Sequence, residues 1–569
     1  MRMINDLKGA KTAKCIHDLR HLVKSSAECF GDRAFYLYKD GAQFTEYSFN
    51  KLLGDMNCIG TAFSILGVLG SVVAVCGDTH PLYTASYLAT VNGGGCIVPI
   101  DKELSDDAIA DFLEFSKAEV FIYTSAKNET VRTLTEKLSK IRYFIAIQPD
   151  PKAEPNDRFL SMKDMIALGQ KALTEGDTSY LDVKLDMEKV CSLIFTSGTT
   201  GTSKGVMLSQ KNLTAAINAS CLSTPYDDQN VFLSVLPPHH TYEMTTCHLS
   251  TLNIGATVVL NDSLKHLMKN LAKFKPNALL LVPLFVETMH KKIWDEAKKK
   301  GKIRLLRASM KACNILLSVG VDMRKTFFSD ITKAFGGNLK SIVCGGAPLS
   351  PDLISDFYTF GITILEGYGI TECAPLVAVN RAGEVRLHSV GTPVMGCTVK
   401  IDKANATDEF GEILVKGDNV MLGYYENPEA TAEVFTPDGW FRTGDLGYLD
   451  DDGYIFITGR KKNVIILSNG KNVFPEELEE YLAGVPEILE SVVLTRQNEQ
   501  GEETITAILV PNKELLADKT DDEIYAFLKD AVNHINQKLP SFKQMRKIEI
   551  RNEPFERTTS KKIQRFKVK

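Results

Sequence analysis

The sequence contains no CxxC pair and no cluster of cysteines and histidines at metal-ligand spacing, although it has 12 cysteines. Structural zinc sites and disulfide-rich secreted domains depend on such patterns, so neither class is favoured. The N-terminal stretch MRMINDLKGAKTAKC also lacks the apolar core of a signal peptide. We therefore expect reduced cysteines and a cytoplasmic location.

An excess of charge of one sign is also missing. Lysine and arginine together number 66 against 71 acidic residues, which gives a net charge of -5. Nucleic-acid-binding proteins usually carry a strongly basic domain, so we expect no nucleic-acid partner. The hydrophobic share of 44% is that of a globular protein. Nothing in the composition indicates an oligomeric state.

No apolar run is long and uninterrupted enough to predict a membrane span. Residues 60–77 carry no charge, and these 18 residues are close to the lower limit for a span. Gly67 and Gly70 divide them into the end of a helix, a turn and the β-rich segment SVVAV. The run therefore predicts a buried step from helix to strand.

The distribution of apolar runs predicts a chain of several units, because 569 residues exceed one ordinary domain. Up to about residue 400, runs such as VVAVCG, CSLIFTS and SIVCGG alternate with helical patterns, which is typical of parallel sheets covered by helices. Short strands and turns then predict a small antiparallel subdomain at 391–461. Helices expected at 475–482 and 521–539 flank two strands. The expected fold class is α/β (α+β overall), with an N-terminal domain at 1–461 and a small α+β C-terminal domain at 462–569.

The segment TSGTTGTSKG, residues 196–205, directly follows the strand-like run CSLIF. Gly198 and Gly201 permit positive φ, so successive backbone N–H groups can point into one concavity, and Lys204 adds a further donor. This pattern predicts a phosphate-binding loop. It is not a Walker A loop, which requires glycine and then a hydroxyl residue at the positions of Ser203 and Gly205.

Two other interpretations of this loop stay open. Gly201, Ser203 and Gly205 also fit GxSxG, the nucleophile elbow of α/β-hydrolases. That elbow needs its serine at a sharp turn from strand to helix. Here six residues separate Thr196 from the serine, and the next helix is expected to begin at Ser209 as N-cap. The second alternative is a surface loop without a ligand.

Four more motifs lie far apart in the chain: GGAP at 345–348, EGYGITE at 366–372, RTGD at 442–445 and TGRKK at 458–462. Each one alone is compatible with a structural role, such as a turn aspartate or a solvated charge. Together with the loop, and in this order, they resemble the acyl-adenylate-forming superfamily. That superfamily includes acyl-CoA synthetases, luciferases and the adenylation domains of peptide synthetases. The resemblance covers nearly the whole chain.

The resemblance implies a site for the triphosphate of ATP. Cations are needed there because an attacking carboxylate and a triphosphate repel each other. Glu372 and the hydroxyl of Thr196 would hold Mg²⁺ and act in catalysis. The phosphates would be held by Thr196, Ser197, Gly198, Thr199, Thr200, Gly201 and Lys204.

The resemblance also implies a site for adenosine. Asp445 would accept hydrogen bonds from both ribose hydroxyls, and Arg460 would steady the same sugar. The ring of Tyr368 would be available to stack on the adenine. The adenine would be bordered by Ala347, Glu366, Gly367, Tyr368, Gly369 and Thr371.

The tail TTSKKIQR, residues 558–565, matches the TxSGK pattern of the superfamily. The resemblance makes Lys562 a catalytic residue that stabilises negative charge on the α-phosphate and carboxylate oxygens. Lys561 stands where the pattern has glycine, so either lysine remains a candidate. The alternative is a solvated basic tail.

The resemblance assigns the second half-reaction to a reorientation of the C-terminal domain. Lys462 falls at the pivot between the adenylation and thiol-transfer arrangements. Gly470 and Lys471 fall where members of the superfamily approach the pantetheine arm of CoA.

Segment 290–337 is unusually basic, and its centre, IRLLRASMKACNILLSV, is amphipathic at helical spacing. A segment of this character before GGAP resembles the long-chain acyl-CoA synthetase branch and implies a fatty acyl substrate. A basic amphipathic helix also suits peripheral contact with anionic lipid. The alternative is a helix packed on its own domain with a solvated face.

The acyl pocket is expected near His240 and Gly345, because LPPHHTYE falls where the superfamily places a gate. Adjacent histidines in an extended segment point to opposite sides, so His239 and His240 are not expected to form a metal pair. A core histidine without a ligand is the alternative.

We therefore expect an ATP-dependent acyl-CoA synthetase. It would activate a carboxylic acid, a medium- or long-chain fatty acid, to acyl-AMP with release of pyrophosphate, and then transfer the acyl group to CoA. The cofactor would be Mg²⁺, with ATP and CoA as co-substrates. The alternatives are a fatty acyl-AMP ligase that loads a carrier protein, a non-catalytic nucleotide-binding scaffold and, last, a hydrolase.

Overall fold

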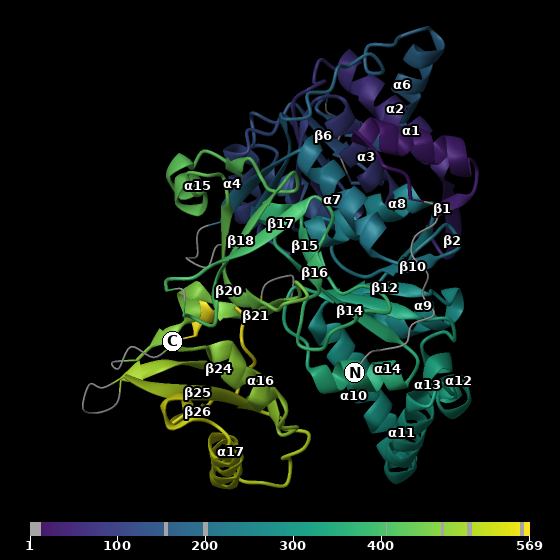
Figure 1. Cartoon of the computed structure of the whole chain (residues 1–569). Helices are drawn as coiled ribbons and strands as arrows, with labels where there is room; N and C mark the ends of the chain where they lie inside the picture. The colour runs from purple at the N-terminus through teal and green to yellow at the C-terminus, as the bar shows by residue number, and fades with distance from the viewer. Residues whose placement is uncertain are drawn as a thin grey trace. The chain divides into compact units, whose positions relative to one another are not determined.

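The computed structural model describes residues 13–152, 157–196, 203–405, 407–467, 472–497, 503–557 and 563–568 (Figure 1). Contacts between residues divide the chain into two compact units. The described part of the first unit lies within 1–198, 203–398 and 416–433, and that of the second within 399–415 and 434–569. The boundaries between them fall inside β17 (Cys397–Asp402), β18 (Gly411–Gly417) and α15 (Pro428–Val434).

The first unit contains an eight-stranded sheet in which β3 to β8 are mutually parallel. Its strands are buried because helices cover both faces, as the apolar runs predict. The order is β19 (Gly423–Tyr424), β9 (Lys204–Ser209), β8 (Val190–Thr196), β4 (Cys96–Ile100), β3 (Val72–Cys76), β5 (Val120–Tyr123), β6 (Tyr143–Ala146) and β7 (Phe159–Ser161).

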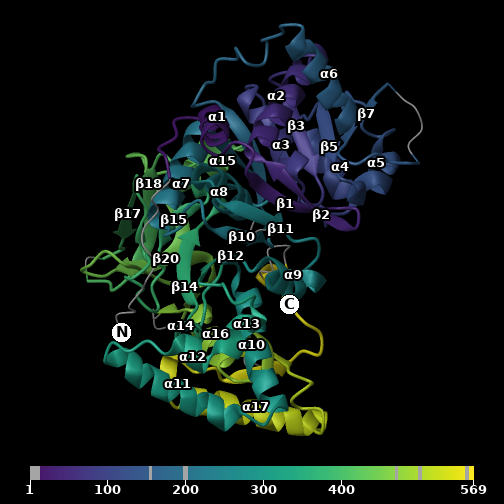
Figure 2. The ribbon, with the colours of Figure 1, turned by 90° about the vertical axis from the view of Figure 1, so that its right-hand side faces the viewer.

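Helices cover both faces of this sheet (Figure 2). One face packs on α4 (Asp106–Phe115) and α5 (Asn128–Leu134). The other face packs on α3 (Pro81–Asn92), behind which lie α2 (Phe49–Ile65), α6 (Met162–Thr174) and α1 (Leu19–Phe30). Helices α2 and α6 approach closely at Gly169, where a Cβ would lie 1.8 Å from the carbonyl oxygen of Cys58.

The first unit also contains a nine-stranded sheet, whose central strands are parallel. The order is β16 (Thr392–Pro393), β15 (Leu376–Val379), β14 (Thr363–Gly369), β13 (Ser341–Gly345), β12 (Ala278–Leu281), β10 (Val231–Ser234), β11 (Thr257–Leu260), β1 (Ala34–Asp40) and β2 (Gln43–Ser48). Its helices are α8 (Ser250–Ile254), α9 (Leu267–Phe274), α10 (Pro283–Lys299), α11 (Ile303–Ser318), α12 (Arg324–Phe327), α13 (Ser329–Ala334) and α14 (Pro351–Thr359).

Two connections hold the sheets of the first unit together. Helix α7 (Gln210–Ser223) contacts both β9 and β15. Residues 416–424 supply the second connection, because the Asn419 side chain donates to the carbonyl of Leu376 at 2.8 Å while Leu422 N–H donates to the carbonyl of Met207 at 3.0 Å. The end of β14 and the strand after the predicted phosphate loop therefore belong to one connected structure.

The second unit contains two larger sheets. The order of the first is β17, β18, β20 (Phe441–Leu449) and β21 (Ile455–Arg460). The second pairs β24 (Ile488–Gln497), β25 (Glu503–Pro511) and β26 (Lys547–Ile550), and packs on α16 (Pro475–Ala483) and α17 (Asp521–Asn536). In this second sheet β24 and β25 are antiparallel, whereas β25 and β26 are parallel. A short pair, β22 (Ile465–Ile466) and β23 (Asn472–Val473), lies between the two larger sheets in sequence.

Several local predictions are confirmed by the structure. Residues 60–77 form the end of α2, a turn with Gly67 and Gly70 at positive φ, and β3. Ser209 is the N-cap of α7, because its hydroxyl accepts from the N–H of Asn212 at 3.2 Å. Among the described residues, no helix has both the length and the apolar character needed to cross a membrane. The α/β fold class is also confirmed.

Candidate active site

The predicted phosphate loop connects two antiparallel strands. β8 ends at Thr196 and β9 begins at Lys204, and these two residues face each other in the ladder. The hydroxyl of Thr196 lies 3.4 Å from the carbonyl oxygen of Lys204. Ser203 is followed by a strand and not by a helix, so the context of a nucleophile elbow is absent. Residues Ser197, Gly198, Thr199, Thr200 and Gly201 lie outside the described residues.

Glu372 is tied to this hairpin through Tyr424, whose hydroxyl donates to Glu372 Oε1 at 2.8 Å. Tyr424 pairs with Val206 in β9, and its ring lies 4.5 Å from Lys204 Nζ in a cation–π contact. Burial, followed by the Glu372 charge, raises the pKa of the Tyr424 hydroxyl, so it stays protonated and donates. The structure thus brings Thr196, Lys204 and Glu372 together through a residue that the motif search did not include.

The segments predicted to border the adenine lie at neighbouring strand ends. β13 and β14 are parallel, and Gly345 pairs with Gly367. The carboxyl ends of parallel strands meet at one edge of a sheet, where open α/β sheets bind ligands. Ala347 is exposed just past β13, whereas Glu366 and Tyr368 on β14 are buried.

Gly369 ends β14 where the backbone folds back on itself. A Cβ at this position would lie 2.1 Å from the carbonyl oxygen of Pro375. The same carbonyl accepts from the N–H of Ile370 at 2.8 Å. Thr371 and Glu372 then form a 3₁₀ turn, Thr371–Cys373. The glycine is required because only hydrogen fits between these backbones, and this close approach aims Glu372 toward Tyr424.

The prediction that His239 and His240 lie in an extended segment is wrong. They occupy a turn that leads into a π-helix, Tyr242–Leu249, and their ring centroids are 5.7 Å apart. The π-helix begins with Tyr242, whose hydroxyl donates to the carbonyl of Val343 at 3.0 Å. Its ring would lie 3.8 Å from a Cβ at Gly345. Tyr242 therefore joins the histidine turn to the end of β13, next to both residues predicted for the acyl pocket.

A buried polar cluster stands on the same π-helix. Glu243 accepts from the hydroxyl of Ser234, and its Oε1 lies 3.8 Å from Nε2 of His248, with both side chains fully buried. His248 Nδ1 is 2.8 Å from the hydroxyl of Tyr36. Burial raises the pKa of Glu243 to about 8 and lowers that of His248 to about 3, so both are neutral at neutral pH.

In the second unit, Asp445 and Arg460 are partners across β20 and β21. Arg460 Nε lies 2.7 Å from Asp445 Oδ1, and the Asp445 side chain is 5% exposed against 41% for Arg460. The N–H of Asp445 donates to the hydroxyl of Thr443 at 3.0 Å. The two residues predicted to hold the ribose thus lie side by side, with the arginine open to solvent.

Glu412 holds the RTGD turn in place. Its carboxylate accepts from Arg442 Nη1 and from Lys461 Nζ, each at 2.9 Å, and from the N–H of Gly444 at 3.3 Å. The side chain is 7% exposed, so these charge-assisted bonds form in a largely dry environment. A single carboxylate therefore links the RTGD and TGRKK motifs, and Lys462 follows directly in a 3₁₀ turn, Lys461–Asn463.

The residues on both sides of the predicted catalytic lysine are anchored to β24 and to α16. Arg557 Nη2 lies 2.9 Å from Glu490, and Arg565 forms an ion pair with Glu479. Arg557 and Ile563 also form an antiparallel bridge. Lys561 and Lys562 themselves lie outside the described residues, as do Gly470 and Lys471.

The described residues contain no group of three or more histidine, cysteine or acidic side chains that would form a metal centre by itself. Mg²⁺ is commonly held by one or two carboxylates together with substrate phosphates. Glu372 fits that role, because it is only partly buried and one of its oxygens accepts from Tyr424.

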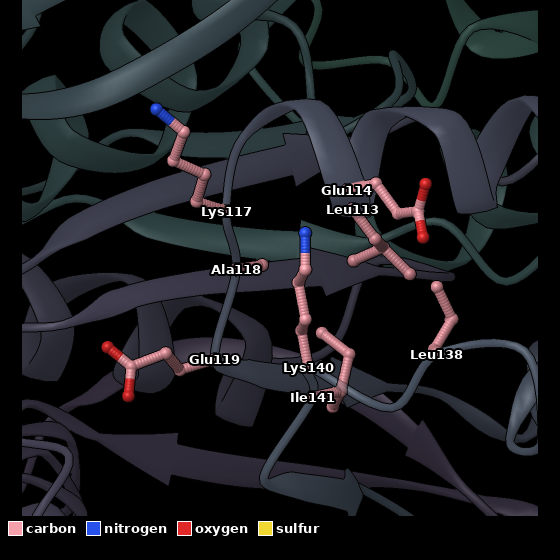
Figure 3. A pocket seen from close by; sticks show the side chains of 8 residues that line it. All are labelled: Leu113, Glu114, Lys117, Ala118, Glu119, Leu138, Lys140 and Ile141. Carbon is pink, nitrogen blue, oxygen red and sulfur yellow. The ribbon is translucent and has the colours of Figure 1, made fainter.

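A small surface pocket of about 180 Å³ lies at the opposite edge of the eight-stranded sheet (Figure 3). It is formed by the end of α4 and by the residues just before β5 and β6, including Lys117, Glu119 and Lys140. Because β5, β6 and β8 run parallel, this pocket lies at the amino ends of the strands, away from Thr196. It is also smaller than a typical ligand site, so it is not part of the candidate active site.

The sequence motifs assign no role to Tyr424, Glu412 or Glu243. Tyr424 carried a weak signal in GYY, close after a glycine at positive φ, Gly423. In the sequence Glu412 is a glutamate within the strand pattern FGEILVKG, and Glu243 is an acid three residues after His240, and neither position indicates a role. Their roles depend on partners far away in sequence, which spacing alone does not show.

Comparison with known proteins identifies the family. The model of the AMP-binding enzyme family matches residues 23–425, and that of the AMP-binding enzyme C-terminal domain matches residues 462–569. A long-chain-fatty-acid–CoA ligase of Mycobacterium bovis is 31% identical over 446 residues, which are 75% of this chain and 72% of that protein. A long-chain-fatty-acid–[acyl-carrier-protein] ligase of Arabidopsis thaliana is 26% identical over 559 residues, 86% of this chain and 76% of that protein.

A solved structure confirms the fold. The crystal structure of an anthranilate CoA ligase in complex with anthranoyl-AMP superimposes with a TM-score of 0.77 at 20% identity, and the match covers 98% of each chain. The chain therefore belongs to the AMP-binding enzyme family, as an AMP-forming acid–thiol ligase of the acyl-adenylate-forming superfamily.

Proposed function

We propose that this protein is a fatty acyl-CoA synthetase. The observation that carries the proposal is the connected cluster of Thr196, Lys204, Tyr424 and Glu372 beside the phosphate-loop hairpin. This cluster supports the proposal because it holds a cation, a hydroxyl and a carboxylate close together, and these are the groups that would bind a triphosphate and its metal ion.

The reaction has two steps. In the first, a carboxylate oxygen of the acid attacks the α-phosphorus of ATP, and pyrophosphate leaves to give acyl-AMP. In the second, the sulfur of CoA attacks the acyl carbon, and AMP leaves with the electrons of the acyl–oxygen bond. The thiol proton passes to solvent or to a base.

In this proposal the first unit holds the triphosphate. Lys204 and the loop after Thr196 neutralise the phosphate oxygens, since repulsion between two anions otherwise opposes the attack. Glu372 would hold Mg²⁺, which supplies positive charge to the phosphates when bound. Tyr424 keeps the Glu372 carboxylate in place. The adenine would lie against Ala347 and the end of β14, with Thr371 at its border.

The second unit supplies the ribose contacts and the catalytic lysine in this proposal. Asp445 would accept from the ribose hydroxyls, and Arg460 keeps its carboxylate oriented. Lys562 would stabilise charge on the α-phosphate. The C-terminal domain would begin at residue 462, with Lys462 as the pivot and with Gly470 and Lys471 approaching CoA during thiol transfer.

A fatty acid is proposed because two features of the chain favour it. The basic α10–α12 region resembles the long-chain branch, and a relative named for long-chain fatty acids shares 31% identity. The pocket would extend from His240 and Gly345, which Tyr242 joins. A relative named for an acyl carrier protein makes a carrier protein the second candidate acceptor.

Pyrophosphate release from ATP and a panel of acids tests the proposal. We expect release to depend on the acid, with medium- or long-chain fatty acids preferred. Mass analysis with CoA, with a carrier protein and with neither distinguishes a CoA ligase from an adenylate ligase. ATP binding without acid-dependent release across the panel would instead indicate a scaffold.

A further inference from the structure

Helix α11 presents two different faces. Its inner face consists of Leu306, Met310, Cys313 and Leu317, which are buried or half-buried. The helix packs on α10, α12 and α14. The spacing of these residues, four, three and four, repeats once per helical turn and accounts for the attachment of α11 to its unit.

The opposite face is apolar but exposed. The outer face of α11 is defined as five apolar residues that recur every three or four positions: Leu305, Ala308, Ala312, Ile315 and Val319. Leu305 is 59% exposed, Ile315 66% and Val319 70%. A helix that only packs on its own domain would carry polar side chains here. Single exposed apolar residues are common, whereas a continuous stripe marks a contact surface.

Positive charge borders this stripe. At 100° per residue, Arg304, Arg307 and Lys311 fall along one side of the outer face. Residues 297–321 contain no acidic side chain, although the whole protein has a net charge of -5. The local basic residues are Lys298, Lys299, Lys300, Lys302, Arg304, Arg307 and Lys311.

We propose that the outer face of α11 rests on the surface of an anionic lipid bilayer. An amphipathic helix with an apolar stripe and basic borders lies in the interface plane, with its apolar side chains among the acyl chains and its cations at the headgroups. The 16 residues of α11 extend about 24 Å, too short to cross a bilayer of about 30 Å. The inner face stays attached to α10 and α14, so the contact is peripheral.

The alternative occupants of this face are a second copy of the chain and an acidic protein. A second copy would bring the same seven cations against each other across an isologous contact, which like-charge repulsion opposes. An acidic protein surface would satisfy the cations, but it would be expected to interleave acidic and apolar groups with the stripe. A bilayer satisfies both features without such matching.

Flotation of the full-length protein with vesicles tests the proposal. The vesicles are neutral phosphatidylcholine, or phosphatidylcholine with about a third phosphatidylglycerol. We expect flotation with the anionic vesicles at low salt, at least tenfold less with the neutral ones, and a decrease at high salt. No flotation with anionic vesicles at low salt, or equal flotation with both, would overturn the proposal.

Two sets of variants locate the contact. The first variant, Leu305→Gln/Ile315→Gln/Val319→Gln, removes the apolar stripe. The second, Arg304→Gln/Lys311→Gln, removes two charges at its border, and each lost charge should lower partitioning onto anionic vesicles about fivefold. Leu222→Gln/Leu264→Gln/Leu489→Gln is the matched control, since these leucines are 53%, 49% and 53% exposed elsewhere. We expect both α11 variants to lose flotation while the control retains it. Equal flotation of the stripe variant and the wild type would refute the assignment to α11.

Three further measurements distinguish loss of the contact from misfolding and from dimerisation. Circular dichroism and pyrophosphate release with a short water-soluble acid should be unchanged in the stripe variant, because its three residues lie on the surface outside the candidate active site. Sedimentation without vesicles identifies a second copy as the occupant: a wild-type dimer that the stripe variant dissociates would overturn the membrane assignment.

Discussion

Tyr424→Phe is the substitution that most directly tests the geometry of the phosphate site. It removes one hydroxyl, whose hydrogen bond to Glu372 Oε1 is 2.8 Å long, and keeps the ring that lies 4.5 Å from Lys204 Nζ. Tyr424 is 6% exposed, so the phenylalanine should keep the same position. The expected defect is a carboxylate less well oriented toward the metal ion and its phosphates.

The size of the effect follows from the bond that is lost. A hydrogen bond to a charged group contributes about 1.5–3 kcal/mol, and water can partly replace it because Glu372 is only half-buried. The low end of that range corresponds to about a tenfold rise in the KM for MgATP. Tyr424→Leu also removes the cation–π contact of about 0.5–1 kcal/mol, so its defect should be a further two- to fivefold.

The assay is pyrophosphate release at varied ATP with saturating acid, repeated at varied free Mg²⁺. Tyr425→Phe is the matched control, since it removes a hydroxyl from the next residue, whose ring faces Phe115 and Lys117 instead. We expect the control to match the wild type within twofold. A KM for MgATP unchanged in Tyr424→Phe, or raised equally in both variants, would refute the proposed link between Tyr424 and Glu372.

Three other substitutions test separate parts of the structure. Lys562→Ala should abolish pyrophosphate release but leave the conversion of supplied acyl-AMP and CoA to acyl-CoA largely intact, whereas Lys561→Ala should retain both; loss of both reactions in Lys562→Ala would contradict its role. Burial raises the pKa of Glu243 from the ordinary 4.5 to about 8, so between these pH values the folded state keeps a proton that the unfolded chain loses. The free energy of unfolding should therefore fall as the pH rises from 4.5 to 8, by up to roughly 5 kcal/mol. Glu243→Gln should flatten this fall in urea unfolding, and an unchanged pH slope would disprove the assignment. Gly369→Ala should destabilise the first unit by about 1–3 kcal/mol because its Cβ meets the Pro375 backbone, while Gly54→Ala, in open space on α2, should be neutral or stabilising in the same measurement.

The sequence predicted those features of the fold that depend on local pattern. Continuous apolar runs such as CSLIFTS and SIVCGG became β8 and β13, buried in sheets with parallel cores, because such strands need no polar face. Ser209 was identified as an N-cap because a hydroxyl before a helical pattern satisfies a free N–H group. The small sheet begins at Cys397 and not at Gly391, since Thr392–Pro393 joins the nine-stranded sheet as its edge strand.

The site was predictable where a motif carried its own geometry and not where it depended on distant partners. The motifs RTGD and TGR assigned Asp445 and Arg460 to one sugar, and the structure has the two residues side by side on paired strands. The histidine turn was mistaken for an extended segment because the π-helix that follows it is a rare element, and because the contact of Tyr242 with the carbonyl of Val343 joins residues 101 positions apart. Tyr424 escaped notice because its partner Glu372 lies 52 residues away, joined only by folding.

The way the chain passes between its two compact units limits where it can bend. The boundaries lie inside β17, β18 and α15, so bending there would break ladder or helical hydrogen bonds in several places at once. Between β21 and β22 the chain forms a 3₁₀ turn at residues 461–463. A hinge rotation there changes a few backbone torsion angles, and it also breaks the packing of α16 on β21 and the hydrogen bond from Asn463 to Glu476. A rotation at this turn would move the C-terminal sheet as one unit. Arg557 and Arg565, on either side of the lysine tail, would move with it because of their ion pairs with Glu490 and Glu479. The small sheet that contains Asp445 precedes this hinge in the sequence, so it would not rotate with the C-terminal sheet.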